Sequence, residues 1–357
     1  MNPWEWIWDY RMEAQRSGNL DQLRLCQLAF NAFSVGPDFP EERLAKFEAA
    51  HDLAIRLKEA WWTLFCEHWV IETLLYGVHR PNVALDRAVR AVLEARKPIY
   101  DAFPQRVHLH LNLVGAYLKV DPIGYQDKLR EAFNYLEPEC EASLELRAYF
   151  SQLKGDFLDA IGDPVSIEVA WEYLQRADEV ASEHFQWDAL YMLAETSYRY
   201  NRPLARQNLG EVARLGEEIA RREDRTNGVA TFIMWQALAA RWKGDETGAA
   251  QLYRSAMELQ AKVPPPRKDI QFAAMAFHCE GSEQEEALRI CQSSLRVLRA
   301  HKLTFAEAQR RLEKCQLLRD MGRDWSAEAR RLRRVGDRLV SKAHWQEQIE
   351  ALGEKPL

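Results

Sequence analysis

The residues best suited to chemistry are histidines and cysteines that lie close together in sequence: His108 with His110, Cys66 with His68, and His278 with Cys279. Residues two apart on a helix point to opposite sides, whereas metal-binding pairs on helices use a spacing of three or four. A thiol beside a histidine becomes a nucleophile only where the fold supplies a further group. We therefore expect no metal site and no catalytic residue among them.

Larger motifs lead to the same expectation. The sequence contains no phosphate-binding P-loop, no Gly-rich dinucleotide fingerprint, no GxSxG, no HExxH and no EF-hand loop. Its six cysteines form no CxxC pair and lie in helix-like runs, which is typical of free, buried thiols in a reducing compartment. We expect a protein that is not an enzyme and needs no cofactor.

The N-terminal residues and the lengths of the apolar stretches indicate where in the cell the protein is expected. The first residues, "MNPWEWIWDYRME", lack a basic segment, and acidic residues interrupt their apolar ones, so a signal peptide is not expected. No apolar run approaches the roughly 18 residues that cross a bilayer. We expect a cytoplasmic protein without a membrane partner.

The elements that position these residues are helices. Apolar residues recur at spacings of three and four almost everywhere, which predicts about seventeen helices separated by short breaks such as "GPDFP" and "IGDP". No Gly/Ser linker divides the chain, so a single domain over 1–357 is expected. Residues 1–36 would form a cap and the first helices, 166–340 the clearest repeats, and 341–357 a C-terminal tail. Two docked helical bundles remain the alternative.

A repeat accounts for the stretch "KGDETGAAQLYRSAMEL". Helices that pack in antiparallel pairs need small residues where their backbones approach. Small residues recur in the same frame, 35 to 44 residues apart, at Ala170, Ala205, Ala249, Ala287 and Ala327. Helical self-similarity at this period indicates a solenoid, in which stacking buries faces that a single pair leaves exposed.

The second half of this repeat resembles a tetratricopeptide repeat. "GDETGAAQLYRSAMEL" has that family's small, aromatic and small residues, and "DALYMLAETSYRYN" matches its first half. The copies here run nearer 40 residues than the family's roughly 34. The resemblance implies an all-α, right-handed α-solenoid of antiparallel helix pairs, in which the first helix of each pair lines a concave face.

Members of that family generally bind segments of other proteins along the concave face. The resemblance therefore implies a protein–protein interaction scaffold whose partner is a protein or peptide, and a cationic row within the face would favour an acidic one. The residues that match the inner positions are Asn112, Lys119, Tyr191, Glu195, Tyr198, Met234, Arg241, Gln271, His278 and Arg319.

Charge is concentrated near the C-terminus. Between Arg289 and Lys342 there are fifteen basic and six acidic residues, although the whole chain carries a net charge of −6. The helix expected there has a basic patch at Arg330, Arg331, Arg333, Arg334 and Arg338. A solvated capping helix, a dock for an acidic protein and a nucleic-acid contact all fit this patch. A regulatory subunit and a nucleic-acid-associated accessory protein therefore remain alternative functions.

Aromatic clusters mark the N-terminal part. Trp4 and Trp8 share one helical stripe, which fits a helix that caps the first pair. Trp61 and Trp62 are adjacent, so no more than one of them can face the neighbouring helix fully.

Overall fold

The computed structural model describes residues 5–36, 39–263, 268–281 and 283–353. Over these ranges the chain forms eighteen α-helices, one π-helical turn and one 3₁₀ turn, and no β-strand. In chain order the elements are α1 (Glu5–Ser17), α2 (Leu20–Phe33), α3 (Pro40–Leu57), α4 (Ala60–Glu72), η1 (Thr73–Gly77), α5 (Pro81–Glu94), η2 (Pro98–Tyr100), α6 (Arg106–Val120), α7 (Gln126–Cys140), α8 (Leu144–Ala160), α9 (Ser166–Val180), α10 (Glu183–Tyr200), α11 (Arg202–Arg222), α12 (Thr226–Trp242), α13 (Glu246–Gln260), α14 (Lys268–Glu280), α15 (Gln284–Ala300), α16 (Thr304–Asp320), α17 (Ser326–Gly336) and α18 (Lys342–Gly353). The predicted all-α class is confirmed.

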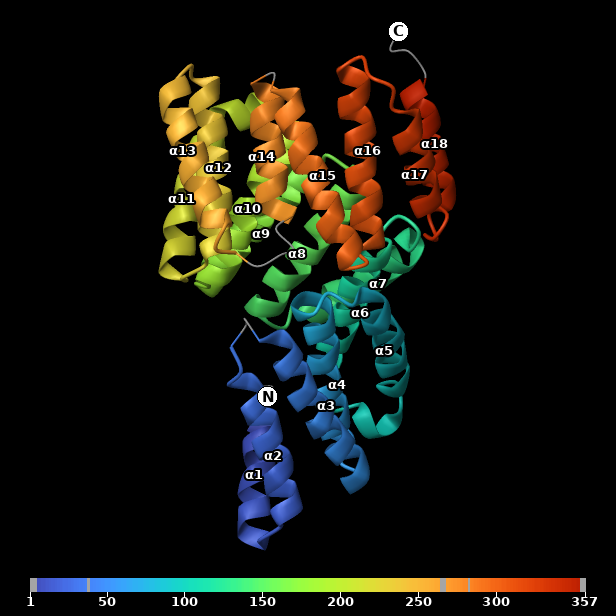
Figure 1. Ribbon diagram of the computed structural model, residues 1–357. Helices are drawn as coiled ribbons and strands as arrows, with labels where there is room; N and C mark the ends of the chain where they lie inside the picture. Colours follow the sequence, from blue (N-terminus) through green and yellow to red (C-terminus); the bar gives the residue numbers. More distant parts are fainter. Residues whose placement is uncertain (1–4, 37–38, 264–267, 282, 354–357) are drawn as a thin grey trace. The chain divides into compact units, whose positions relative to one another are not determined.

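The chain divides into two compact units, which are described separately. Unit 1 comprises Met1–Val120 with Lys128–Glu139, and unit 2 comprises Asp121–Asp127 with Cys140–Leu357. Within each unit, helices that are neighbours in sequence mostly pack against each other (Figure 1). The prediction of one continuous array over 1–357 stays a prediction.

Unit 2 is built from helix pairs, with α8, α10, α12, α14 and α16 as the first helices. Each first helix packs on the helix that comes directly after it, which is the second helix of the pair. The first helices α8, α10, α12 and α14 also contact one another in succession. Contact between successive pairs is what a stacked helical repeat requires.

Turn chemistry explains where these helices begin and end. Gly244 follows α12 with φ +81°, a conformation that is strained for residues with a Cβ. The next residue, Asp245, caps α13 by accepting a hydrogen bond from the Gly248 amide at 2.8 Å. Ser143, Ser182 and Asn201 cap α8, α10 and α11 in the same way. The "GD" that precedes the repeated small residue is therefore a helix end followed by a helix start.

The repeat frame holds at four of its five small positions. Ala170, Ala205, Ala249 and Ala287 are all buried. Ala327 is exposed, so the weak last copy is wrong at this position. The neighbouring Ala329 packs inward with Leu332 instead, because α17 begins only at Ser326 and presents a different face.

The C-terminal region differs from the expected single helix and tail. The chain turns between α17 and α18, where buried Asp121 accepts hydrogen bonds from the Ser341 amide at 2.8 Å and the Ser341 hydroxyl at 2.7 Å. Helix α18 then buries Trp345, Ile349 and Leu352 against a core that includes Phe305. Most of the expected tail is thus a packed helix.

The aromatic residues of unit 1 mostly form its core. Trp62 is buried, whereas Trp61 is half-buried and donates to the Ile99 carbonyl at 3.2 Å. Trp6, rather than Trp8, is the inward residue of α1, and it packs edge-on against Trp62. Trp8 lies exposed beside Phe30. Trp4 lies outside the described residues.

Candidate functional site

Three first helices of unit 2 bring charged side chains into one cluster. Asp159 comes from the last turn of α8, Glu195 and Arg199 from one face of α10, and Arg310 and Glu313 from α16. Arg199 pairs with Glu195 at 2.6 Å, and its Nε lies 3.8 Å from Asp159 Oδ1. The charge of Glu313 acts on Arg199, and Glu313 pairs with Arg310 at 2.8 Å. We name these five residues the α10 cluster.

Aromatic groups flank the α10 cluster. The Arg199 guanidinium lies 4.2 Å from the ring centre of Phe272 on α14, close enough for a cation–π contact. The Tyr191 hydroxyl donates to Glu195, and the Tyr200 hydroxyl donates to the Asp159 carbonyl at 2.9 Å. A charged centre with aromatic borders is a chemical setting that suits recognition of a peptide.

The pKa values of Asp159 and Arg199 are shifted because both side chains are partly buried. The Asp159 side chain is 23% exposed, yet burial is the largest cause that raises the pKa of its carboxyl to about 6. Arg199 opposes that rise, and Glu195 adds to it. Burial lowers the pKa of Arg199, but the carboxylates of Glu195, Asp159 and Glu313 outweigh burial and raise it. Arg199 is thus a firmly charged cation that remains 29% exposed.

The structure brings two of the expected inner-face residues into this site. Tyr191 and Glu195 both lie half-buried on α10 and hydrogen-bond to each other. Tyr198, on the same helix, is buried instead and stacks on Trp242 with ring centres 6.3 Å apart. The Arg202 guanidinium also lies over its ring, 3.5 Å from the ring centre. Tyr198 therefore joins helix pairs and offers no free aromatic surface.

Several other expected residues are also internal. Met234, Gln271 and Asn112 are buried, which corrects their expected place on an open face. The reason for Met234 is that α12 is surrounded by neighbouring helices, with α11, α13 and α14 packed on it. Arg319 remains partly exposed and lies 3.4 Å from Asp320.

The expected cationic row is already neutralised at two positions. Arg241 donates to the Phe277 carbonyl at 2.9 Å and lies 3.3 Å from both Glu246 and Glu283. The buried His278 ring contacts the same Glu283 at 2.5 Å. The Arg241 contacts join successive helix pairs, and His278 contacts the same glutamate, so the expectation that these two side chains stand ready for an acidic partner needs correction.

Asn112 and Lys119 lie in unit 1, where they contact different partners. The Asn112 amide donates to the His68 carbonyl at 3.0 Å and lies 2.7 Å from His68 Nδ1. Lys119 lies over the Tyr76 ring at 5.7 Å. Burial raises the pKa of nearby Glu72 to about 7, against the field of Arg43.

The histidines and thiols singled out from the sequence are shielded rather than activated. His68 and His108 lie with ring centres 5.5 Å apart, and burial lowers the pKa of His108 to about 4. Burial also raises the pKa of the Cys279 thiol to about 11 and that of Cys66 further. Within the described part of the chain, no three His, Cys, Asp or Glu side chains are placed to hold a metal ion. Nor is any described helix long and apolar enough to cross a bilayer.

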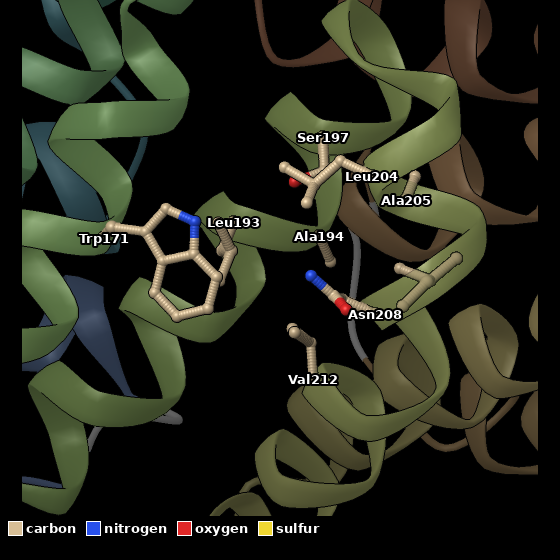
Figure 2. A pocket seen from close by; sticks show the side chains of 9 residues that line it. Trp171, Leu193, Ala194, Ser197, Leu204, Ala205, Asn208 and Val212 are labelled. Carbon is tan, nitrogen blue, oxygen red and sulfur yellow. The ribbon is translucent and has the colours of Figure 1, made fainter.

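A small pocket opens between α9, α10 and α11 (Figure 2). Trp171, 44% exposed, forms one side, and α11 forms the other. The empty volume, which includes open solvent, is about 220 Å³. Its lining residues are Trp171, Leu193, Ala194, Ser197, Leu204, Ala205, Asn208, Leu209 and Val212. The residues that line the pocket are mostly apolar, and none of them is ionisable.

Sequence reasoning missed Asp159, Arg199 and Phe272. The spacing of four between Glu195 and Arg199 was a usable signal, because it predicts an ion pair on one helical face. Asp159 and Phe272 come from other repeats, and no local pattern links them to α10. The basic patch, in contrast, is exposed at all five expected positions, four on α17 and Arg338 in the turn after it.

No protein-family model matches the chain, and no curated protein matches it either.

Proposed function

We propose that this protein is a non-catalytic scaffold that holds an extended segment of a partner protein against the first helices of unit 2. The proposal includes a right-handed, tetratricopeptide-like solenoid for this unit. The observation that carries it is the α10 cluster: Arg199 is partly exposed and charged, although three first helices contribute to its surroundings. A recessed charge with polar and aromatic neighbours can orient a peptide that enters beside it.

The composition of the cluster defines what the segment must offer. Asp159, Glu195 and Glu313 supply acceptors, and Arg199 supplies donors. A partner backbone has both amide donors and carbonyl acceptors, so an extended chain can satisfy both kinds of group. The ion pairs of Arg241 and the contact of His278 with Glu283 occupy both side chains within the helix packing.

The test uses a random-peptide library displayed on phage and selected on the wild-type protein. Selected peptides are then measured by calorimetry on Glu195→Gln/Arg199→Gln, which removes both charges but keeps similar side-chain size. We expect binding to weaken at least tenfold, or by about 1.4 kcal/mol. Thermal melting checks that the variant folds.

A matched control exists on the second helix α11. Arg214 and Glu218 are also four residues apart and form an ion pair, and both are exposed. The variant Arg214→Gln/Glu218→Gln should bind the same peptides within about twofold of wild type, because exposed pairs contribute little. Equal binding by both double variants would reject the α10 cluster as the peptide site.

A further inference from the structure

A second surface stands apart from the α10 cluster on the outer side of α17. Leu332 and Val335 point into the core of unit 2, and the opposite side carries only basic side chains over two turns. We name this surface the α17 arginine face. It consists of Arg330, Arg331, Arg333 and Arg334 on α17 and Arg338 just after it, all exposed.

Two acids beneath this face are buried and already pair with several cations. Glu307 accepts from Arg311 at 2.8 Å, and Glu328 accepts from Lys314 at 2.7 Å. Arg331 and Arg338 reach down to Glu328 and Glu307 at 3.1 and 3.4 Å. In all, two buried carboxylates serve five cations, which are Arg299, Arg311, Lys314, Arg331 and Arg338.

The outermost arginines pair with no acid in the described part of the chain, although the charge of Arg330 acts on Asp324. Within the described residues, Arg330, Arg333 and Arg334 form no ion pair, although most exposed arginines elsewhere in unit 2 do. Arg333 and Arg334 follow Arg330 by three and four residues, so their Cβ atoms lie about 5–6 Å from that of Arg330 on the same side of the helix. The excess positive charge of the region therefore faces solvent in an ordered row.

The row is short and has acidic ends. Helix α17 has eleven residues, which is about 16 Å of helix. Asp324 lies just before it and Asp337 just after it, and both are exposed. A long polyanion such as duplex nucleic acid would run past the arginines into these carboxylates. A short acidic segment fits between them.

We propose that the α17 arginine face binds a short acidic segment of a partner protein, about a dozen residues long. Planar guanidinium groups pair with carboxylates through two parallel hydrogen bonds, and the row offers several such sites at helical spacing. This interaction does not depend on the α10 cluster and can occur whether or not that cluster binds a peptide.

The test measures fluorescence anisotropy of a labelled peptide of alternating Glu-rich and Ala-rich turns, about twelve residues long. The same peptide with Gln in place of Glu is the neutral comparison. We expect wild-type protein to bind the acidic peptide and not the neutral one, with affinity that falls as salt rises above about 0.15 M. The variant Arg330→Glu/Arg333→Glu/Arg334→Glu should bind at least tenfold more weakly.

The control reverses the same number of charges elsewhere. Arg90, Arg254 and Lys262 are exposed and form no ion pair in the described structure, so Arg90→Glu/Arg254→Glu/Lys262→Glu changes net charge equally. It should keep most of the binding, which separates a local site from a general charge effect. The proposal is overturned if wild type fails to bind the acidic peptide, or if both triple variants lose binding alike. It is also overturned if a duplex DNA of similar length binds this face more tightly than the peptide does.

Discussion

Gly281 lies where the Arg241 guanidinium crosses from one helix pair to the next. A Cβ atom at position 281 would overlap Nη1 of Arg241. That guanidinium donates to the Phe277 carbonyl and pairs with Glu283, and it lies 3.7 Å from the Phe277 ring centre. A single missing side chain thus permits a set of contacts that joins α12 to α14.

We therefore expect Gly281→Ala to displace Arg241 and destabilise the protein by about 1–3 kcal/mol, since a buried carbonyl would lose its charged donor. Urea denaturation followed by circular dichroism measures this. Gly36→Ala is the control because open space surrounds that position, and it should change stability by no more than about 0.5 kcal/mol. If both variants unfold at the wild-type midpoint, the Arg241 contacts contribute nothing to stability.

The repeat frame makes a packing prediction at Ala249. This residue is fully buried, where α13 packs closely on α12. Ala249→Leu adds three carbon atoms to a filled space and should cost about 1–3 kcal/mol. The control Gln251→Leu, on the exposed side of the same helix, should stay within about 0.5 kcal/mol. Thermal melting of the two variants measures these effects. If Ala249→Leu melts at the wild-type temperature, the repeated small residue does not mark a close approach of two helices.

Local patterns predicted the helices and the buried alanines because both depend on spacing within one segment. They did not predict the break between α17 and α18, which depends on the hydrogen bonds of Ser341 with Asp121, 220 residues earlier. Local patterns did not predict the α10 cluster either. Glu195 was expected at an inner position, but Asp159 and Glu313 act on its partner Arg199 only through the stacking of separate helix pairs.

The burial of Asp159 makes a prediction about pH. The pKa of its carboxyl is raised to about 6 in the folded protein, mainly by burial, whereas an unfolded chain has an aspartate pKa of about 3.9. The folded state therefore holds the proton more tightly between these values. The protonated Asp159 carboxyl therefore stabilises the folded state fully below about pH 4, and this contribution is lost as the pH rises through about 6.

Asp159→Asn removes this titration while keeping the shape of the side chain. Other groups, such as His108 with its lowered pKa, titrate in both proteins and cancel in the difference. We expect the free energy of unfolding of wild type, relative to the variant, to fall by about 1–3 kcal/mol between about pH 4 and pH 6.5. Urea titrations at several pH values give this difference directly. A difference that stays constant over the range would mean that Asp159 ionises in the folded protein as it does in an unfolded chain, and that the α10 cluster is open to water rather than recessed.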